Sequence, residues 1–298
     1  MLVCVFHIGN YWSGTKNKQP NWNNEEISYY QMEINGVARY YIKQKMKVSI
    51  ITTCYNRCST IQNAMESVLA QDYRDIEYIV VDGASTDGSV EVIREMMKDA
   101  RWKSTYKFIS EPDSGMYEAI NKGIRMTTGD VIGLVHSDDM LYDNRVISDV
   151  AKKFKESKAD FVYADGIFVN AQNIDKIVRY WKSGGYHRWE VKLGWLPLHT
   201  TCYIRRDVMQ REGLYDESYK IAADTEFLVR YLYEARLKVV YMKRLVVRMR
   251  MGGLSTNRKS RRQIWREDIR LYKAHGFAAK STKLMKMMRK VPQFIKKK

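Results

Sequence analysis

The chain has 298 residues, of which 45% are hydrophobic, so it suits one large packed domain and argues against wholesale disorder. It has no run of 18 apolar residues, no signal-peptide cleavage pattern at its start, and no CxxC pair among its 4 cysteines. We therefore expect no transmembrane helix, no disulfide framework, and a reducing, cytoplasmic setting. The net charge of +17 arises at the carboxy-terminal end, because residues 238–298 contain 20 basic and 2 acidic side chains.

Residues 1–45 show no clear periodicity, so we treat them as an amino-terminal extension of unclear role. From residue 46 onward, short β-branched runs alternate with segments whose apolar residues recur at helical spacing. Strands are expected at Val48–Thr53, Tyr78–Val81, Tyr106–Ile109 and Val131–Val135. A helix is expected after each of the first three. Each connection is long enough for a crossover, so the pattern predicts an α/β domain with a mostly parallel central sheet flanked by helices.

The second half of the domain alternates less regularly. Phe161–Ala164 and Thr201–Ile204 are short strand candidates, and Thr225–Ala235 is typical of a helix. The apolar pattern of Val239–Met251 favours an extended segment, although a helix also fits it.

Polar or acidic side chains follow all four strands of the first half. Ligands bind outside the carboxyl ends of parallel strands, so the loops that begin at Thr53, Asp82, Glu111 and His136 should face one cleft. The chain has no GxGxxG or GxxxxGKS loop, which disfavours a dinucleotide or P-loop site.

The last of these loops contains two adjacent carboxylates, Asp138 and Asp139. They repel each other unless a cation or a hydrogen-bonding ligand shares the site, and Mg²⁺ or Mn²⁺ with a bound diphosphate satisfies both needs. Taken alone, the pair fits an ordinary turn better.

The segments VSIITTCYNR, VVDGASTDGS, EPDSGMYEAINKGIRMTTGD and VIGLVHSDD together resemble family 2 glycosyltransferases. The resemblance covers residues 46–253 and implies a GT-A fold, with a nucleotide-sugar donor half in 46–139 and an acceptor half in 140–253. It implies a metal-dependent, inverting enzyme of cell-surface polysaccharide biosynthesis. The resemblance further implies that the enzyme moves one sugar from a nucleotide sugar, with UDP as the expected nucleotide, to a glycan or polyprenyl-diphosphate-linked acceptor.

The resemblance also implies roles for residues of the donor half. Thr53 and Tyr55 match residues that contact the nucleotide, and Asp82 matches the acid that hydrogen-bonds the base. Asp113 lies in the EPDxG turn and Lys122 on the helix that faces the donor. From the residues alone, Asp82 also fits a turn cap, Asp113 a helix cap and Lys122 a solvated helix face.

The triplet Ser137-Asp138-Asp139 occupies the DXD position of the family, with Ser in place of the first Asp. The resemblance implies that Asp139 holds Mn²⁺ or Mg²⁺ and that Asp138 contacts the ribose or a metal-bound water. One of Arg248, Arg250 and Arg258 is expected to supply charge to the leaving diphosphate, and the sequence does not choose among them.

The general base of the family is an Asp at the start of a late helix, which here is Asp224 in IAADTEFLVRYL. It would take the proton from the acceptor hydroxyl as that oxygen attacks the anomeric carbon. Glu226 and Asp216 are rivals, and Asp224 also fits a helix cap. His199 lies in a segment that the resemblance places near the acceptor, although a lone histidine also fits a structural role. The QxxRW motif of processive members is absent, which favours transfer of a single sugar.

Residues 254–298 form a basic tail, for which we predict a helix. Leu284, Met287, Met288 and Val291 fall on one helical stripe, and Pro292 should end the helix near residues 288–291. Such a helix can lie on an anionic membrane surface, so residues 280–298 predict peripheral contact with the inner face of the plasma membrane. Alternatively, the stripe packs back on the domain.

Two other functions remain open from the sequence. The tail fits a nucleic-acid-binding protein, but no recognition motif occurs and we expect no nucleic acid to bind. A sugar nucleotidyltransferase would have a related α/β architecture, but TCYNRCST lacks the glycine-rich loop that such enzymes have after the first strand.

Overall fold

The computed structural model describes residues 29–34, 37–42, 46–99, 101, 106–252 and 261–290. The chain divides into two compact units, residues 1–45 and 46–298. In the first unit, β1 (Tyr29–Ile34) pairs antiparallel with β2 (Val37–Ile42). The second unit contains every residue for which the sequence predicts a function.

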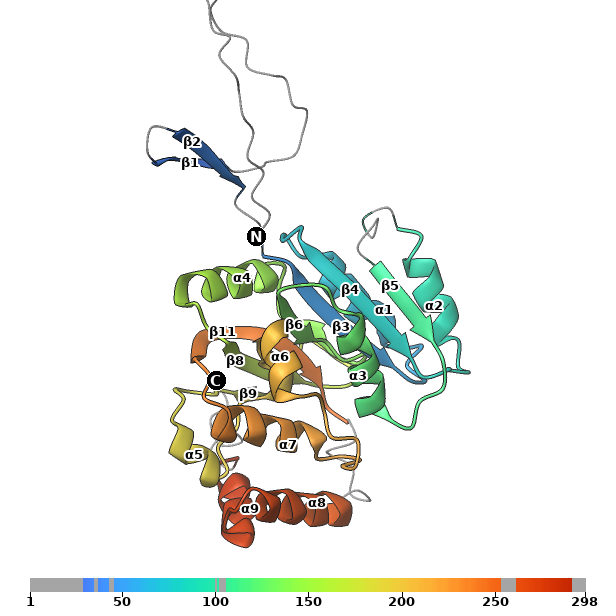
Figure 1. Ribbon diagram of the computed structural model, residues 1–298. Coiled ribbons are helices and arrows are strands. Elements are labelled where there is room, and N and C mark those ends of the chain that lie inside the picture. The colour runs from blue at the N-terminus through green and yellow to red at the C-terminus, as the bar shows by residue number, and fades with distance from the viewer. Residues whose placement is uncertain are drawn as a thin grey trace, which may run out of the picture. The chain divides into compact units, whose positions relative to one another are not determined.

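The first half of the second unit is a parallel α/β layer (Figure 1). Its strands lie in the order β5 (Tyr106–Ser110), β4 (Ile76–Asp82), β3 (Val48–Cys54), β6 (Val131–Leu134), and neighbouring strands are parallel. Its helices are α1 (Ile61–Leu69), α2 (Ser89–Met96) and α3 (Met116–Met126). Both central strands, β3 and β4, are buried along their whole length because helices cover both faces of the sheet. The predicted strands and helices of this half are therefore confirmed.

The second half extends the same sheet with mixed pairing. It adds β10 (Tyr203–Arg205), β8 (Phe161–Val169), β11 (Val239–Arg250), β7 (Met140–Leu141) and β9 (Ile177–Trp181). β10 is antiparallel to β6 and to β8, while β8 and β11 are parallel. The connection from β8 to β9 is too short for a crossover, so these two strands form an antiparallel pair. The whole sheet is therefore mixed, and the predicted parallel pairing describes its first four strands.

The remaining helices complete the layers on the two faces of the sheet. They are α4 (Val146–Ser157), α5 (Arg188–Lys192), α6 (Arg206–Glu212), α7 (Ala223–Val229), α8 (Arg261–Ala274) and α9 (Ala279–Met288). One apolar cluster lies between the sheet and the helices α1, α2 and α4. A second cluster includes side chains of α3, α6, α7 and α8.

Two boundaries in the second half differ from the sequence prediction. The helix expected at Thr225–Ala235 begins at Ala223 and changes to a π-helical turn at Arg230–Glu234. The strand expected at Thr201–Ile204 begins at Tyr203, because a 3₁₀ turn precedes it. The extended alternative for residues 239–251 is correct, since β11 occupies them.

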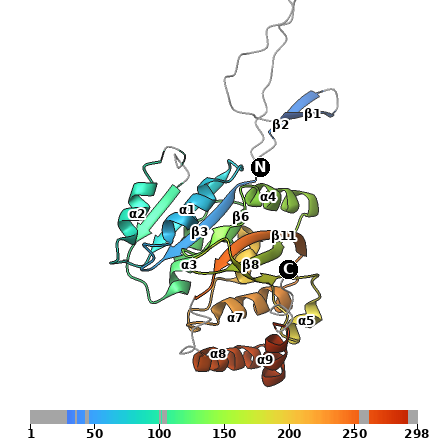
Figure 2. The same ribbon diagram turned by 180° about the vertical axis from the view of Figure 1, so that it is seen from behind.

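The carboxy-terminal tail folds onto the domain. Figures 1 and 2 both show α8 and α9 beside α7, on the side away from the sheet. The helix predicted near Lys280 is present and ends at Met288. The predicted apolar stripe points outward, with Leu284, Met287 and Met288 exposed by 55%, 49% and 63%. The fourth member of the stripe, Val291, lies outside the described residues.

Candidate active site

The loops after β3, β4 and β5 begin at the same level of the sheet. Cys54 lies opposite Asp82, and Asp82 lies opposite Ser110. The loop after β6 starts beside β3, because the Val135 N–H donates to the carbonyl of Ile51 at 3.0 Å. The carboxyl ends of the four strands therefore form one edge, as expected for a ligand site in a parallel sheet.

Tyr55, Gly83 and Asp113 lie close together at this edge. A Cβ on Gly83 would be 2.5 Å from Oδ2 of Asp113 and 3.3 Å from Cδ2 of Tyr55. Tyr55 is 61% exposed. Asp113 accepts the Gly115 N–H on Oδ1 at 2.9 Å, which leaves Oδ2 without a hydrogen bond from a described residue. Burial raises the pKa of Asp113. An exposed aromatic ring beside a carboxylate acceptor suits a flat heterocycle that donates an N–H.

Asp82 is fully buried, and its carboxylate is occupied by neighbouring loops. Oδ1 accepts the Ser85 hydroxyl at 2.5 Å, and Oδ2 accepts the Ser85 N–H at 2.9 Å and the Ser110 hydroxyl at 2.7 Å. The turn-capping role considered for Asp82 is therefore present. Direct contact of Asp82 with a base stays a prediction, as does contact of the buried Thr53 with a nucleotide.

Lys122 binds the turn that carries Asp113. Its ammonium donates to the Pro112 carbonyl at 3.0 Å and pairs with Glu111 at 3.0 Å and Glu118 at 3.2 Å. An ammonium has three protons, and these three oxygens can take all of them. The structure thus places Lys122 where it orders the Glu111–Gly115 turn, and direct contact with a donor stays a prediction.

The loop after β6 places the side chain of Asp139 inside the protein. Asp139 is 2% exposed, its Oδ1 accepts the Arg250 N–H at 3.1 Å, and its Oδ2 is buried without a hydrogen-bond partner. Burial raises the pKa of Asp139 well above its usual range, and the charge of Asp138 adds to this effect. A buried carboxylate oxygen without a partner is stabilised by a cation.

The surroundings of Asp139 fit a magnesium or manganese ion that takes most of its ligands from a substrate. Among the described residues, no group of three or more His, Cys, Asp and Glu side chains could hold a metal ion. Mg²⁺ commonly uses one or two protein carboxylates and completes its shell with phosphate oxygens and water. Asp138, half-buried and next in the chain, is the second available carboxylate.

Arg250 contacts Asp139 through its backbone N–H. Its guanidinium donates to the Ala171 carbonyl at 3.1 Å and to Oδ1 of Asn63 at 2.9 Å, and these two hydrogen bonds fix the orientation of its side chain. Arg248 instead lies over the Tyr142 ring, with its guanidinium carbon 4.9 Å from the ring centre. Arg258 lies outside the described residues. The structure therefore separates two arginines that the sequence left equivalent.

A third group joins the loop after β6 to the start of α7. The rings of His136 and His199 stack with their centres 6.2 Å apart. Burial lowers the pKa of His199 to about 4, and the nearby Asp224 carboxylate opposes this shift. Burial also lowers the pKa of His136, against the charges of Asp138 and Asp224. Burial therefore favours the neutral form of both rings, and the charge of Asp224 acts on both.

Asp224 lies in the first turn of α7 and is half-buried. Its Oδ1 accepts the Thr225 N–H at 2.6 Å and lies 3.3 Å from the Thr225 hydroxyl. The other carboxylate oxygen, Oδ2, has no hydrogen bond from a described residue. Tyr117 of α3 fixes the preceding loop, because its hydroxyl donates to the Ile221 carbonyl at 2.7 Å.

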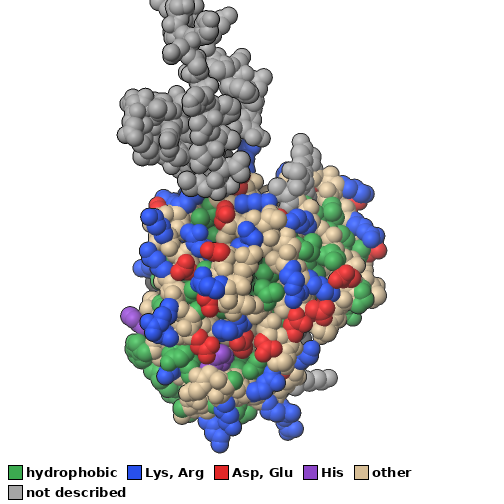
Figure 3. Space-filling model, viewed as in Figure 1, with side chains coloured by type: hydrophobic (Ala, Val, Ile, Leu, Met, Phe, Trp, Pro, Cys, Tyr) green, Lys and Arg blue, Asp and Glu red, His purple; other side chains and the backbone are tan. Residues whose placement is uncertain are grey.

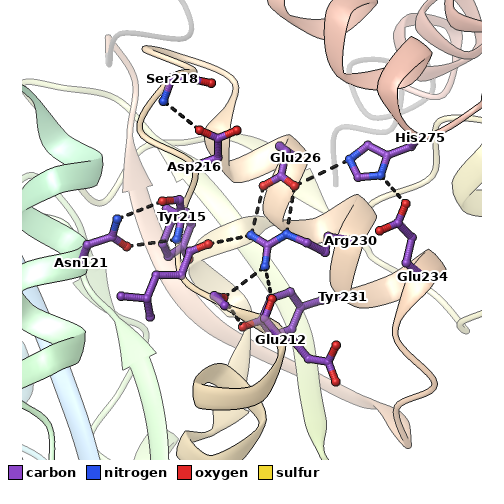
Figure 4. Close-up of polar contacts among 12 residues, drawn as sticks. Asn121, Glu212, Tyr215, Asp216, Ser218, Glu226, Arg230, Tyr231, Glu234 and His275 are labelled. Carbon is purple, nitrogen blue, oxygen red and sulfur yellow. Dashed lines mark hydrogen bonds and ion pairs between the residues drawn. The ribbon is translucent and has the colours of Figure 1, made fainter.

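The two rival carboxylates have other partners, as Figure 4 shows. Glu226 accepts two hydrogen bonds from Arg230, at 2.9 and 3.1 Å, and lies 3.6 Å from His275. Asp216 is on the surface, where it accepts the Ser218 N–H at 2.9 Å. The geometry therefore favours Asp224 as the carboxylate that can receive a proton from a ligand.

His136 is the site residue that the sequence analysis left without a role. It directly follows the buried strand and begins the HSDD motif, which is the signal that could have marked it. His199, which was expected near an acceptor, donates or accepts a hydrogen bond through Nε2 with the Tyr215 hydroxyl at 2.6 Å. That contact fits the structural role, and contact with an acceptor stays a prediction.

The fold and this edge define a class of α/β transferases with the GT-A architecture, and comparison with known proteins gives the family. The sequence profile of Glycosyl transferase family 2 matches residues 49–213, so the chain belongs to this family and is a glycosyltransferase. Thr53, Tyr55, Asp82, Asp113 and the Asp138–Asp139 pair lie within the matched region. Asp224 lies beyond it.

The curated relatives are also glycosyltransferases. A PGL/p-HBAD biosynthesis glycosyltransferase of Mycobacterium bovis is 25% identical over 209 residues, covering 70% of this chain and 78% of the relative. An uncharacterized glycosyltransferase of Mycobacterium tuberculosis is 28% identical over 190 residues, covering 61% and 68%.

Solved structures share the fold. TarS of S. aureus in complex with UDP-GlcNAc superposes with a TM-score of 0.60 at 17% identity, covering 76% of this chain and 65% of that one. A mannosyltransferase of Pyrobaculum calidifontis in complex with GDP-Man and Mn²⁺ gives a TM-score of 0.57 at 14% identity, covering 78% and 65%. The chain spans 39% of the longer TarS chain.

Proposed function

We propose that this glycosyltransferase moves one sugar from a nucleotide-sugar donor to a hydroxyl of its acceptor, with a divalent cation and with inversion at the anomeric carbon. The observation that carries the proposal is the buried, unpartnered Oδ2 of Asp139 in the loop that also places His136 beside Asp224. A cation-binding carboxylate and a proton-accepting carboxylate thus belong to one site. The complexes of TarS with UDP-GlcNAc and of the mannosyltransferase with GDP-Man and Mn²⁺ support the donor class and the cation.

Each group has a defined task in this reaction. Asp139, assisted by Asp138, would hold Mn²⁺ or Mg²⁺, which neutralises charge on the leaving diphosphate. Arg250, fixed beside Asp139, adds positive charge there. Tyr55 and Asp113 bind the nucleobase, whose ring N–H donates to Oδ2 of Asp113. Uracil and guanine both carry such an N–H, and UDP is the nucleotide that the family resemblance implies.

Asp224 performs the proton transfer. Its Oδ2 removes the proton from the acceptor hydroxyl while that oxygen bonds to the anomeric carbon and the bond to the diphosphate breaks. Attack comes from the face opposite the leaving group, so the configuration inverts.

A thermal-shift screen tests the donor and the cation together. UDP, GDP, UDP-GlcNAc and GDP-mannose are each added with and without Mn²⁺. A ligand that binds the folded protein raises its melting temperature, and the stabilisation grows with the logarithm of the ligand concentration relative to the dissociation constant. We expect stabilisation by one nucleotide series that depends on Mn²⁺ and is lost in Asp139→Asn. Equal stabilisation with and without the cation would remove the metal from the proposal.

We further propose that the acceptor is a glycan or polyprenyl-diphosphate-linked lipid of a cell-surface polysaccharide, reached at an anionic membrane surface. No described helix is long and apolar enough to cross a membrane. The outward side chains of α9 and the exposed Trp265 of α8 instead offer a shallow apolar surface. Lys and Arg side chains gather over this end of the molecule (Figure 3), and the exposed ones include Arg261, Arg262 and Lys280.

Apolar groups within a basic rim fit an anionic bilayer, where each basic side chain contributes about 1 kcal/mol. Sedimentation with phosphatidylglycerol vesicles tests this contact. The double variant Met287→Ser/Met288→Ser should pellet less than the wild type. The control variant Ile177→Ser/Val178→Ser changes two exposed apolar residues of β9 and should pellet equally. Unchanged pelleting of the double variant would refute the α9 contact.

A further inference from the structure

The two carboxy-terminal helices contain a buried ionic cluster directly beneath α7. Asp268 of α8 is fully buried, and two lysines of α9, Lys283 and Lys286, pair with its two carboxylate oxygens. Burying ionised groups is unfavourable unless each gains partners of opposite charge or hydrogen bonds. The two lysines face one aspartate, so the cluster has an excess of positive charge, and the charge of Asp224 also acts on Lys286.

Only one of the two lysines reaches the candidate base. The ammonium of Lys286 lies 3.2 Å from Oδ1 of Asp268 and donates to the Thr225 hydroxyl at 2.9 Å. The Thr225 hydroxyl in turn lies 3.3 Å from Oδ1 of Asp224. Lys283 instead pairs with Asp268 alone among the described carboxylates, and its ammonium lies 5.9 Å from the centre of the Trp265 ring.

The direction of these hydrogen bonds fixes the state of Thr225. An ammonium can only donate, so the Thr225 oxygen accepts from Lys286 and its own proton is free to point at Asp224. Oδ1 of Asp224 then accepts two hydrogen bonds, one from the Thr225 N–H and one from the Thr225 hydroxyl. Both interactions hold Oδ1 in place and leave Oδ2 as the oxygen open to a ligand.

We propose that Lys286 is a positioning residue for the catalytic base, acting through Thr225 to orient the Asp224 carboxylate. This inference rests on the proposed role of Asp224. It makes α9, which lies outside the region matched by the family profile, part of the apparatus for proton transfer.

Two further contacts position these helices, one between α8 and the loop before α7 and one between α9 and the residues that follow α5. Glu267 of α8 accepts the N–H groups of Lys220, Ile221 and Ala222 at 3.2, 2.9 and 2.8 Å, and these residues lead into α7. Gly194 lets α9 approach closely, because a Cβ there would be 2.6 Å from the backbone nitrogen of Lys286. The position of Lys286 relative to Thr225 is therefore set by the backbone.

The experiment compares variants of two lysines with the same partner. Release of nucleoside diphosphate is measured with whichever of UDP-GlcNAc and GDP-mannose stabilises the full-length protein. For Lys286→Met and Thr225→Val we expect kcat to fall about tenfold, since small misplacement of a reacting group is enough for such a loss. The donor KM should change less than about twofold, because neither residue belongs to the donor half. Lys283→Met removes an equal charge from Asp268 and should leave kcat within about threefold of the wild type.

Two combined variants give a readout that a merely structural role does not produce. In the double variant Thr225→Val/Lys286→Met, kcat should fall no further than in either single variant, because both act through one chain of hydrogen bonds. Lys286→Arg, which keeps a donor near Thr225, should recover part of the loss. The inference would be overturned if the fold-losses in kcat of the two single variants multiply in the double variant. It would also be overturned if Lys283→Met loses as much kcat as Lys286→Met.

Asp224→Asn separates this inference from the function on which it rests. If Asp224→Asn keeps wild-type kcat, the proposed base is wrong and the positioning role falls with it. If Asp224→Asn is inactive while Lys286→Met and Thr225→Val match the wild type, only the positioning role is wrong. Should Lys286→Met fail to fold, Thr225→Val decides, since it removes only a hydroxyl. Hydrogen exchange of the Thr225 amide can be measured without substrate, and an exchange rate in Lys286→Met equal to that of the wild type would also overturn the inference.

Discussion

The side chain of Asp139 leads to a prediction in which stability and activity change in opposite directions. Its Oδ2 is buried without a partner, so without a ligand the protein carries the unfavourable free energy of a desolvated carboxylate. Asp139→Asn keeps the oxygen that accepts the Arg250 N–H and replaces the unpartnered oxygen with a neutral amide. We therefore expect the ligand-free variant to be more stable than the wild type.

The size of the effect follows from the burial. An unsatisfied charged group is less favourable than an unsatisfied neutral group by about 1 to 2 kcal/mol. In a folded unit of this size, about 1 kcal/mol shifts the melting temperature by about 2 to 4 °C. The ligand-free Asp139→Asn variant should thus melt about 2 to 8 °C higher, while its Mn²⁺-dependent stabilisation by a nucleoside diphosphate disappears.

Differential scanning fluorimetry of the ligand-free and the ligand-loaded protein measures both changes. Asp138→Asn is the matched control, because Asp138 is half-buried in the same turn and is not left with a buried, unpartnered oxygen. It should raise the ligand-free melting temperature by less than Asp139→Asn does. A ligand-free Asp139→Asn variant that melts below the wild type would show that Oδ2 is already satisfied by the protein.

Three further predictions concern other parts of the chain. Asp224→Asn should lower turnover at least about 100-fold, because a general base acts on the acceptor. The dissociation constant of the donor, measured by calorimetry, should stay unchanged; weaker donor binding would indicate that Asp224 contacts the donor instead. Gly83→Ala should weaken nucleotide binding with little change in melting temperature, because the new methyl group enters the space beside Asp113. Unchanged affinity would show that the nucleobase does not bind in this space. Burial opposes ionisation of Glu77, but hydrogen bonds from Lys107, Ser49 and Thr128 hold its pKa at about 2, below the ordinary 4.5. Its stabilisation is therefore present above pH 4.5 and lost as the pH falls toward 2, so the melting temperature of Glu77→Gln should depend less on pH over that range.

The first half of the domain could be predicted from the sequence because its signals are local. Each buried strand is one uninterrupted apolar run, each helix repeats at its own spacing, and the polar residues that follow a strand necessarily lie at one edge of a parallel sheet. The second half depends on pairing between distant segments. β10 is three residues long and lies between β6 and β8, and nothing within residues 203–205 specifies those neighbours.

The charge of the tail shows a different limit of sequence reasoning. A count of basic residues treats Lys283 and Lys286 as solvated cations, whereas both pair with the buried Asp268. A period of 3.6 residues places the lysines opposite the apolar stripe but does not say which face meets the domain. Asp268 decides this, because a buried carboxylate needs cationic partners and α9 can supply them only with its basic face inward.

This orientation gives α9 two separate faces whose roles can be tested independently. Leu284, Met287 and Met288 face solvent, while Lys286 contacts Thr225 on the inner side. Met287→Ser/Met288→Ser should reduce sedimentation with anionic vesicles and leave turnover in lipid-free solution unchanged. Lys286→Met should lower that turnover and leave sedimentation unchanged. If the outer variant also slows turnover without lipid, its methionines support the packing of α9, and their exposure is not an indication of membrane contact.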